Sequence, residues 1–134
     1  MIRRLTLVLV VAVLPSCGGG GGGNSPSGPT AGGGGPVLPG EAATITVTST
    51  GVSPREVTVP VGARVNFVNQ GSVIIEMTSD PHPVHTDCPA INQVGGLRPA
   101  ETGQTGALNT ARRCGFHDHG RGEDSRFMGT IIIQ

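Results

Sequence analysis

A cysteine, two histidines and a methionine lie close together near the C-terminal end of the chain. Cys114, His117 and His119 fall in one short segment, and Met128 opens an apolar run after a polar loop. Thiolates, imidazoles and thioethers are ligands for transition metals. A loop that leads directly into a strand can hold such ligands against a rigid sheet. This spacing therefore predicts a metal site that uses Cys114 and His117, with His119 as a further candidate ligand.

The remaining histidines stand in a proline-rich segment upstream. His82 and His85 precede Cys88, so all 4 histidines of the chain lie in the two segments that contain Cys88 and Cys114. Histidine-rich polar loops are common metal sites, and each of these residues is a candidate ligand. The alternative is that His82 and His85 are surface loop residues and that His119 caps a turn.

The elements that must position these residues are short strands. Apolar and polar residues alternate in several segments separated by Gly and Pro, which is typical of an all-β antiparallel sandwich. The expected strands are 44–48, 56–61, 63–69, 73–77, a weak one at 105–110, 111–116 and 128–133. Prolines exclude a regular helix across 79–103, so that part is expected to be a long loop. The domain is expected to span 43–134.

The N-terminal part has the pattern of an export signal followed by a tether. Arg3 and Arg4 precede the apolar run 5–14, and Cys17 follows at a small-residue site. The segment 1–17 resembles a bacterial lipoprotein signal, which implies lipidation of Cys17; an ordinary secretory signal is the alternative. The Gly/Pro/Ser-rich segment 18–42 is expected to be a disordered linker. The protein is therefore expected in the bacterial cell envelope, periplasmic or cell-surface, held to a membrane by lipid.

Composition and spacing argue against other function classes. The formal net charge is zero and only 2% of residues are aromatic, so a nucleic-acid surface is not expected. Cys114, His117 and Asp118 could suggest a nucleophile, a base and an orienting acid. Their spacing is that of metal ligands, however, and Asp118 is then expected as an outer partner that orients an imidazole. No oxyanion-forming element is apparent, so no enzyme is expected. The domain is expected to be a monomer.

Two parts of the sequence together resemble the cupredoxin, or blue copper, family. They are the segment 52–69, VSPREVTVPVGARVNFVN, and the later Cys114-x-x-His117 with a Met128-Gly-Thr-Ile strand. The resemblance implies a Greek-key β-sandwich, one copper ion and electron transfer with an unidentified redox partner. It maps a thiolate ligand onto Cys114 and an imidazole ligand onto His117. A second imidazole would come from His82, His85 or His119.

The chain departs from the family pattern in two places. The usual imidazole position shortly after Asn69 is filled here by Ile74, Ile75 or Glu76. Glu76 could act as a carboxylate ligand instead; the alternative is that Glu76 is an outward-facing strand residue. Met128 stands one residue after the usual place of the axial methionine, and a one-residue shift turns a strand side chain to the opposite face. Axial ligation by Met128 is therefore a separate prediction.

The two cysteines of the domain offer a rival interpretation. In an exported protein, Cys88 and Cys114 are by default expected to form a disulfide, which would remove the thiolate that a blue copper site requires. Two hypotheses result. One is a membrane-tethered copper protein in electron transfer; the other is a redox-inactive cupredoxin-like domain that stores or delivers copper or acts as an interaction module.

Overall fold

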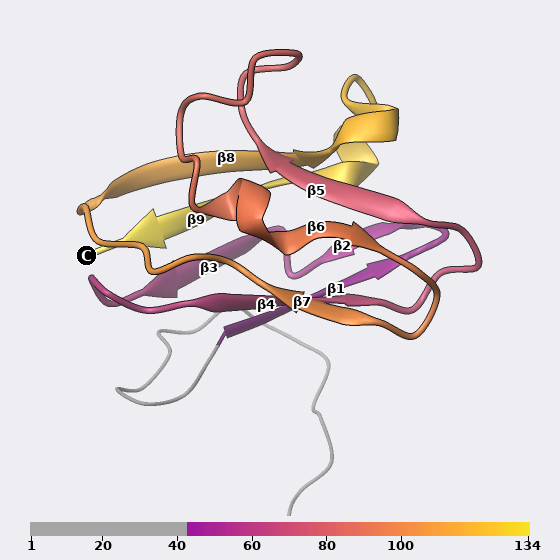
Figure 1. Ribbon diagram of the computed structural model, residues 1–134, viewed down its shortest axis with the longest axis horizontal. Coiled ribbons are helices and arrows are strands. Elements are labelled where there is room, and N and C mark those ends of the chain that lie inside the picture. Colours follow the sequence, from indigo (N-terminus) through magenta and orange to yellow (C-terminus); the bar gives the residue numbers. More distant parts are fainter. Residues whose placement is uncertain (1–42) are drawn as a thin grey trace, which may run out of the picture. The chain divides into compact units, whose positions relative to one another are not determined.

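The computed structural model describes residues 43–134, and these form a β-sandwich without an α-helix (Figure 1). The expected signal, Cys17 and the linker lie outside the described residues. Within the described part, no helix is long and apolar enough to cross a membrane. The strands are β1 (Ala43–Thr48), β2 (Gly51–Ser53), β3 (Glu56–Val59), β4 (Val65–Asn69), β5 (Ile75–Ser79), β6 (Gly95–Leu97), β7 (Thr102–Gln104), β8 (Arg112–Asp118) and β9 (Met128–Ile133). Three short 3-10 helices accompany them: η1 (Ile91–Val94), η2 (His119–Arg121) and η3 (Ser125–Phe127).

The strands form two sheets stacked face to face (Figure 1). One sheet has the order β2-β1-β4-β7, and the other has the order β3-β9-β8-β5-β6. The expected sandwich is confirmed, but the sheets are mixed and not purely antiparallel. β1 runs parallel to β4, and β3 runs parallel to β9. Because the chain changes sheets between β2 and β3 and again before β4, the parallel neighbours are joined by crossovers, whereas β1 and β2 form a hairpin.

Most of the expected strands occur within a few residues of their predicted positions. The weak strand expected at 105–110 is wrong, because the backbone pairs earlier, at β7, and continues without strand structure. Thr105 ends the pairing: its hydroxyl accepts a hydrogen bond from the Val65 amide, and its own amide donates to the Val65 carbonyl. The expected long loop at 79–103 contains η1 and β6, and β6 extends the five-stranded sheet at its edge.

The core lies between the sheets and is aliphatic apart from three phenylalanines. Phe67 of β4 and Phe116 of β8 meet edge to face, with ring centroids 5.1 Å apart. Ile45, Met77 and other apolar residues pack around them without exposure to solvent. Gly129 lies beneath the Phe116 ring, where an added Cβ would come within 2.4 Å of the ring carbon Cζ. A side chain at Gly129 would thus displace the central core ring.

The two faces of β8 have different roles because side chains alternate along a strand. Cys114 and Phe116 point into the sandwich, where both are fully buried. Gly115 and His117 face away from the core, and His117 lies opposite Thr78 of β5. The loop that follows β5 rises over this outer face of the five-stranded sheet (Figure 1). The fold therefore places His117 beneath the histidine-bearing loop.

Candidate metal centre

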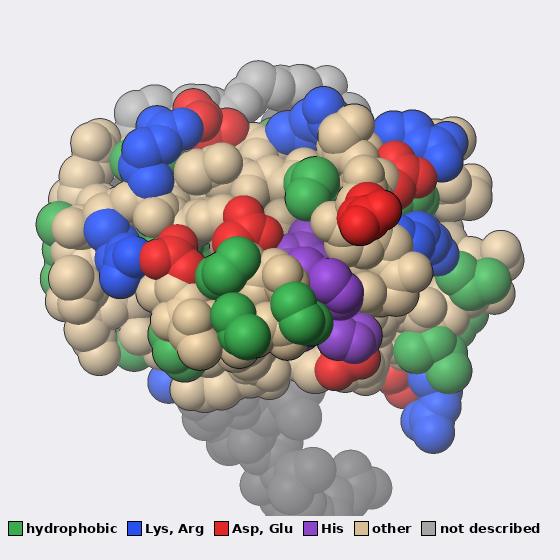
Figure 2. Space-filling model, turned by 90° about the horizontal axis from the view of Figure 1, so that it is seen from above, with side chains coloured by type: hydrophobic (Ala, Val, Ile, Leu, Met, Phe, Trp, Pro, Cys, Tyr) green, Lys and Arg blue, Asp and Glu red, His purple; other side chains and the backbone are tan. Residues whose placement is uncertain are grey.

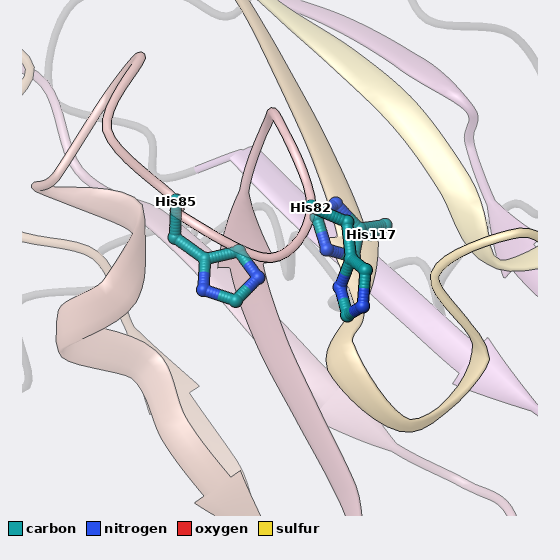
Figure 3. A group of neighbouring side chains, drawn as sticks. All are labelled: His82, His85 and His117. Atoms are coloured by element: carbon teal, nitrogen blue, oxygen red, sulfur yellow. The ribbon is translucent and has the colours of Figure 1, made fainter.

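The four histidines converge on the outer face of the five-stranded sheet, where neighbouring ring centroids lie 4.9–5.5 Å apart and the solvent-exposed rings form one patch (Figure 2). His82 and His85 come from the loop after β5, and His117 comes from β8 (Figure 3). One ring nitrogen from each of these three lies within 4.8 Å of the others. His119, the first residue of η2, places its Nδ1 3.3 Å from Nε2 of His85. The structure thus brings together all four imidazoles that the sequence indicated.

His117 is the buried member of the cluster. Its side chain has no exposure, its Nδ1 lies 2.7 Å from Oδ1 of Asp80, and its Nε2 lies 3.3 Å from the Thr78 hydroxyl. Both ring nitrogens therefore have polar partners, as buried imidazoles require. The sequence indicates Asp118, and not Asp80, as the carboxylate that orients an imidazole. No spacing rule identifies Asp80, because the contact joins residues on different elements.

Asp118 has a different role because it lies on the opposite face of β8 from His117. Its Oδ1 accepts a hydrogen bond from the Glu76 amide at 3.0 Å, and its Oδ2 lies 3.5 Å from Nε of Arg121. The carboxylate is almost fully buried. Asp118 therefore anchors the start of β5 and η2, and it supports the site only through the position of these elements.

Backbone contacts close the loop that carries His82 and His85. The Asp87 amide donates to the Asp80 carbonyl at 2.8 Å, and the His85 amide donates to the Pro81 carbonyl at 2.8 Å. Asn92 of η1 bridges the loop to β5, because its side chain donates to the His85 carbonyl and accepts from the Ser79 amide. His85 itself has a positive φ of 51°, which turns the chain back toward the sheet. The loop is thus held as a compact unit above β8.

A disulfide ties the end of the same loop to β8. Cys88 and Cys114 are bonded, with their Cα atoms 5.8 Å apart. The prediction that Cys114 supplies a thiolate ligand is therefore wrong, and the alternative disulfide is confirmed. The strand period explains this: β8 extends through both Cys114 and His117, and residues three apart on a strand point to opposite faces. The expected tight loop between them does not form.

Comparisons of the sequence find no match, whereas comparisons of the structure match the fold of the chain. No protein-family model and no curated protein sequence matches it. Amicyanin from Paracoccus versutus superposes with a TM-score of 0.56 at 15% identity, over 72% of this chain and 85% of amicyanin. A purple cupredoxin from Nitrosopumilus maritimus gives a TM-score of 0.54 at 15% identity, over 69% and 99% of the two chains. Plastocyanin from Dryopteris crassirhizoma gives 0.53 at 16% identity, over 69% and 100%. The chain has the cupredoxin fold.

Two further predicted ligands have defined positions in this domain of cupredoxin fold. Met128 lies directly opposite His117 in the β8–β9 register and is half-buried, so both side chains share the outer face of the sheet. Axial ligation by Met128 stays a prediction. Glu76 is exposed on β5, and its carboxylate is not part of the group of three histidines within 4.8 Å. Glu76 still acts on the cluster through its charge, as the pKa of His85 shows.

The pKa of His85 is lowered from its ordinary value of 6.5. Partial burial is the main cause, and repulsion from the charged forms of His117, His119 and His82 adds to it; the negative charge of Glu76 opposes the shift. A lowered pKa keeps His85 neutral at neutral pH. Neutral imidazole is the form that binds a metal ion.

This shift makes the stability of the metal-free domain pH-dependent. Because the unfolded chain takes up the His85 proton at a higher pH than the folded chain does, the free energy of unfolding should fall as the pH drops below about 6.5. Above that pH the contribution of His85 is constant. Urea denaturation from pH 8 to pH 5 should show this loss, and His85→Gln should make it smaller. An identical pH profile for the variant would contradict the assignment.

Proposed function

We propose that this cupredoxin domain binds one copper ion through the imidazoles of His82, His85 and His117, and that it stores or delivers copper. His119 is the candidate fourth ligand. The observation that carries the proposal is the convergence of three imidazole nitrogens within 4.8 Å, two from a closed loop and one from the strand β8 beneath it. Two nitrogens bound to one ion at about 2.0–2.1 Å stand at most about 4 Å apart, so the donors are close to the separation that a single ion needs.

The donor set favours copper among the common metals. Imidazole nitrogens suit Cu(II), Ni(II) and Zn(II), and Cu(II) binds most tightly of the divalent first-row ions. The fold is shared with proteins that carry copper, including an amicyanin variant solved in its Cu(I) form. The Asp80 carboxylate on the back of the His117 ring is the kind of partner that metal-bound histidines have. These features favour copper over metal ions that prefer oxygen ligands.

The same donors argue against a blue copper centre. A blue site needs a thiolate, and among the described residues both cysteines are joined in the disulfide. Without that soft ligand the site favours Cu(II) over Cu(I), and fast cycling between the two states loses its structural basis. The proposal therefore takes the storage or delivery alternative in place of electron transfer. A disulfide also fits an exported protein, and we retain lipid anchoring through Cys17, a cell-envelope location and a monomeric state as proposals.

The absorption spectrum tests this proposal. On addition of one equivalent of Cu(II) we expect only weak visible absorption, and the intense thiolate-to-copper band of blue copper proteins should be absent. Thiol titration of the unfolded domain should find no free thiol at positions 88 and 114, and the intact mass should be two hydrogens below that of the reduced chain. An intense band or two titratable thiols would instead restore Cys114 as a ligand.

A further inference from the structure

The contact between Asp80 and His117 is supported by hydrogen bonds that hold the Asp80 backbone in place. His117 is fully buried, whereas the Asp80 side chain is 42% exposed. Asp80 stands at the start of the histidine loop, the segment after β5 that carries His82 and His85. The Asp80 backbone is held on both sides: its amide donates to the Gly115 carbonyl at 3.1 Å, and its carbonyl accepts from the Asp87 amide at 2.8 Å. The carboxylate is thus fixed above β8 and directed at one ring nitrogen.

This contact determines which nitrogen of His117 carries the proton. A neutral imidazole has one N–H donor and one acceptor nitrogen, while an ionised carboxylate can only accept. With Oδ1 of Asp80 at 2.7 Å, the proton belongs on Nδ1 and the lone pair on Nε2. The Thr78 hydroxyl, 3.3 Å from Nε2, can donate to that lone pair in the metal-free protein. The ring is therefore oriented, and the nitrogen that carries the lone pair is defined before any ion arrives.

Gly115 makes room for this carboxylate. It lies on the same outer face of β8 as His117, and a Cβ added there would come within 1.9 Å of Oδ2 of Asp80 and 2.8 Å of its Cγ. The φ angle of Gly115 is not positive, so the backbone conformation does not require a glycine at this position. The absence of a side chain is explained by the space that Asp80 occupies.

We propose that Asp80 is a positioning residue that selects Nε2 of His117 as the metal-binding nitrogen, and that Gly115 serves to admit its carboxylate. The inference rests on the proposed copper function and names the residues that prepare its buried ligand. Outer carboxylates of this kind typically change metal affinity by about 10- to 100-fold when removed. Asp80 contacts the ligand and not the ion. Its effect on metal affinity is therefore expected to act through the tautomer and orientation of the His117 ring.

The first test reads the ring directly in the metal-free protein. Nitrogen NMR of the His117 ring should show the Nδ1–H tautomer in the wild type and a mixture of tautomers in Asp80→Ala. Asp80→Asn should restore the wild-type tautomer in part, because the amide oxygen can still accept from Nδ1. An unchanged tautomer in Asp80→Ala would overturn the inference without any metal being added.

The second test measures Cu(II) affinity by competition with a chromogenic chelator. We expect Asp80→Ala and Gly115→Ala each to lose about 10- to 100-fold, and the double variant to lose no more than Asp80→Ala alone, since both remove one contact. Asp87→Ala is the matched control: it removes a carboxylate from the same loop, one that pairs with Arg112, and should leave the affinity unchanged. Urea denaturation of each variant separates loss of folding from loss of binding.

The outcomes separate the two proposals. A wild type that binds no Cu(II) would overturn the proposed function and this inference with it. A wild type that binds Cu(II) while Asp80→Ala binds it equally or more tightly would overturn the inference alone, because Asp80 would then be idle or would compete with the ion for Nδ1. Additive losses in the double variant would show that Gly115 acts separately from Asp80, against the inference.

Discussion

Replacing His117 by Gln should lower the Cu(II) affinity of the domain more than about 100-fold, a larger loss than that from an outer-sphere partner. His117 is the one buried imidazole of the cluster, and its ring is held by both Asp80 and Thr78. A glutamine preserves much of the polarity but removes the imidazole nitrogen that the site provides. Competition titration against a chelator, at neutral pH, measures the loss.

The control for this prediction comes from the histidine loop itself. Val84 lies between His82 and His85 in the sequence and is 60% exposed. Its apolar side chain takes no part in the hydrogen bonds of the site. Val84→Ala should therefore bind Cu(II) as the wild type does. His85→Gln should show a loss comparable to that of His117→Gln, because both residues belong to the group of three. Wild-type affinity in both histidine variants would refute the assignment of the site.

Replacing both Cys88 and Cys114 by Ala should lower the free energy of unfolding by about 3.5 kcal/mol, the chain-entropy value for a loop of this length. The bridge closes a segment with a sequence separation of 26, which begins just after the loop that carries His82 and His85 and contains η1, β6 and β7. Such a loss is a large fraction of the stability of a small domain. Equilibrium urea denaturation at several temperatures measures it.

The disulfide should also affect the metal site, since it joins the loop that carries His82 and His85 to the strand that carries His117. We expect the double Ala variant to bind Cu(II) more weakly even under conditions in which it is folded. Asp87→Asn provides the comparison, because it breaks only the exposed ion pair with Arg112 beside the bridge and should cost less than about 1 kcal/mol. A double Ala variant with unchanged stability and affinity would contradict a structural role for the bridge.

Much of the fold could be predicted from the sequence because the strands follow a period of two. The segments around Ile45, Phe67 and Ile131 alternate in hydropathy, and all three residues are buried in the core. The mixed sheets could not be predicted, since alternation shows which face is buried and not which strand lies alongside. The edge strands β6 and β7 were also beyond prediction, because Gly-rich segments such as Gly95–Leu97 carry little pattern.

The site was predictable in part. The four histidines were recognised as candidate ligands, and the structure brings all of them together. Their grouping depends on the loop after β5 folding over β8, which no local pattern indicates. The role of Cys114 was misassigned because the Cys-x-x-His spacing was interpreted as a loop, whereas β8 extends through it and separates the two side chains. Asp80 was missed because its partner is distant in sequence.

The central claim is that imidazoles from the histidine loop and β8, and not the sulfur of Cys114, hold the copper ion. Electron paramagnetic resonance of the wild-type domain with one equivalent of Cu(II), with natural and with 15N-labelled histidine, tests this most directly. The account predicts hyperfine coupling to several ring nitrogens that changes on labelling. Coupling that is unaffected by the histidine label, or the small copper hyperfine splitting typical of a thiolate-bound blue site, would contradict it.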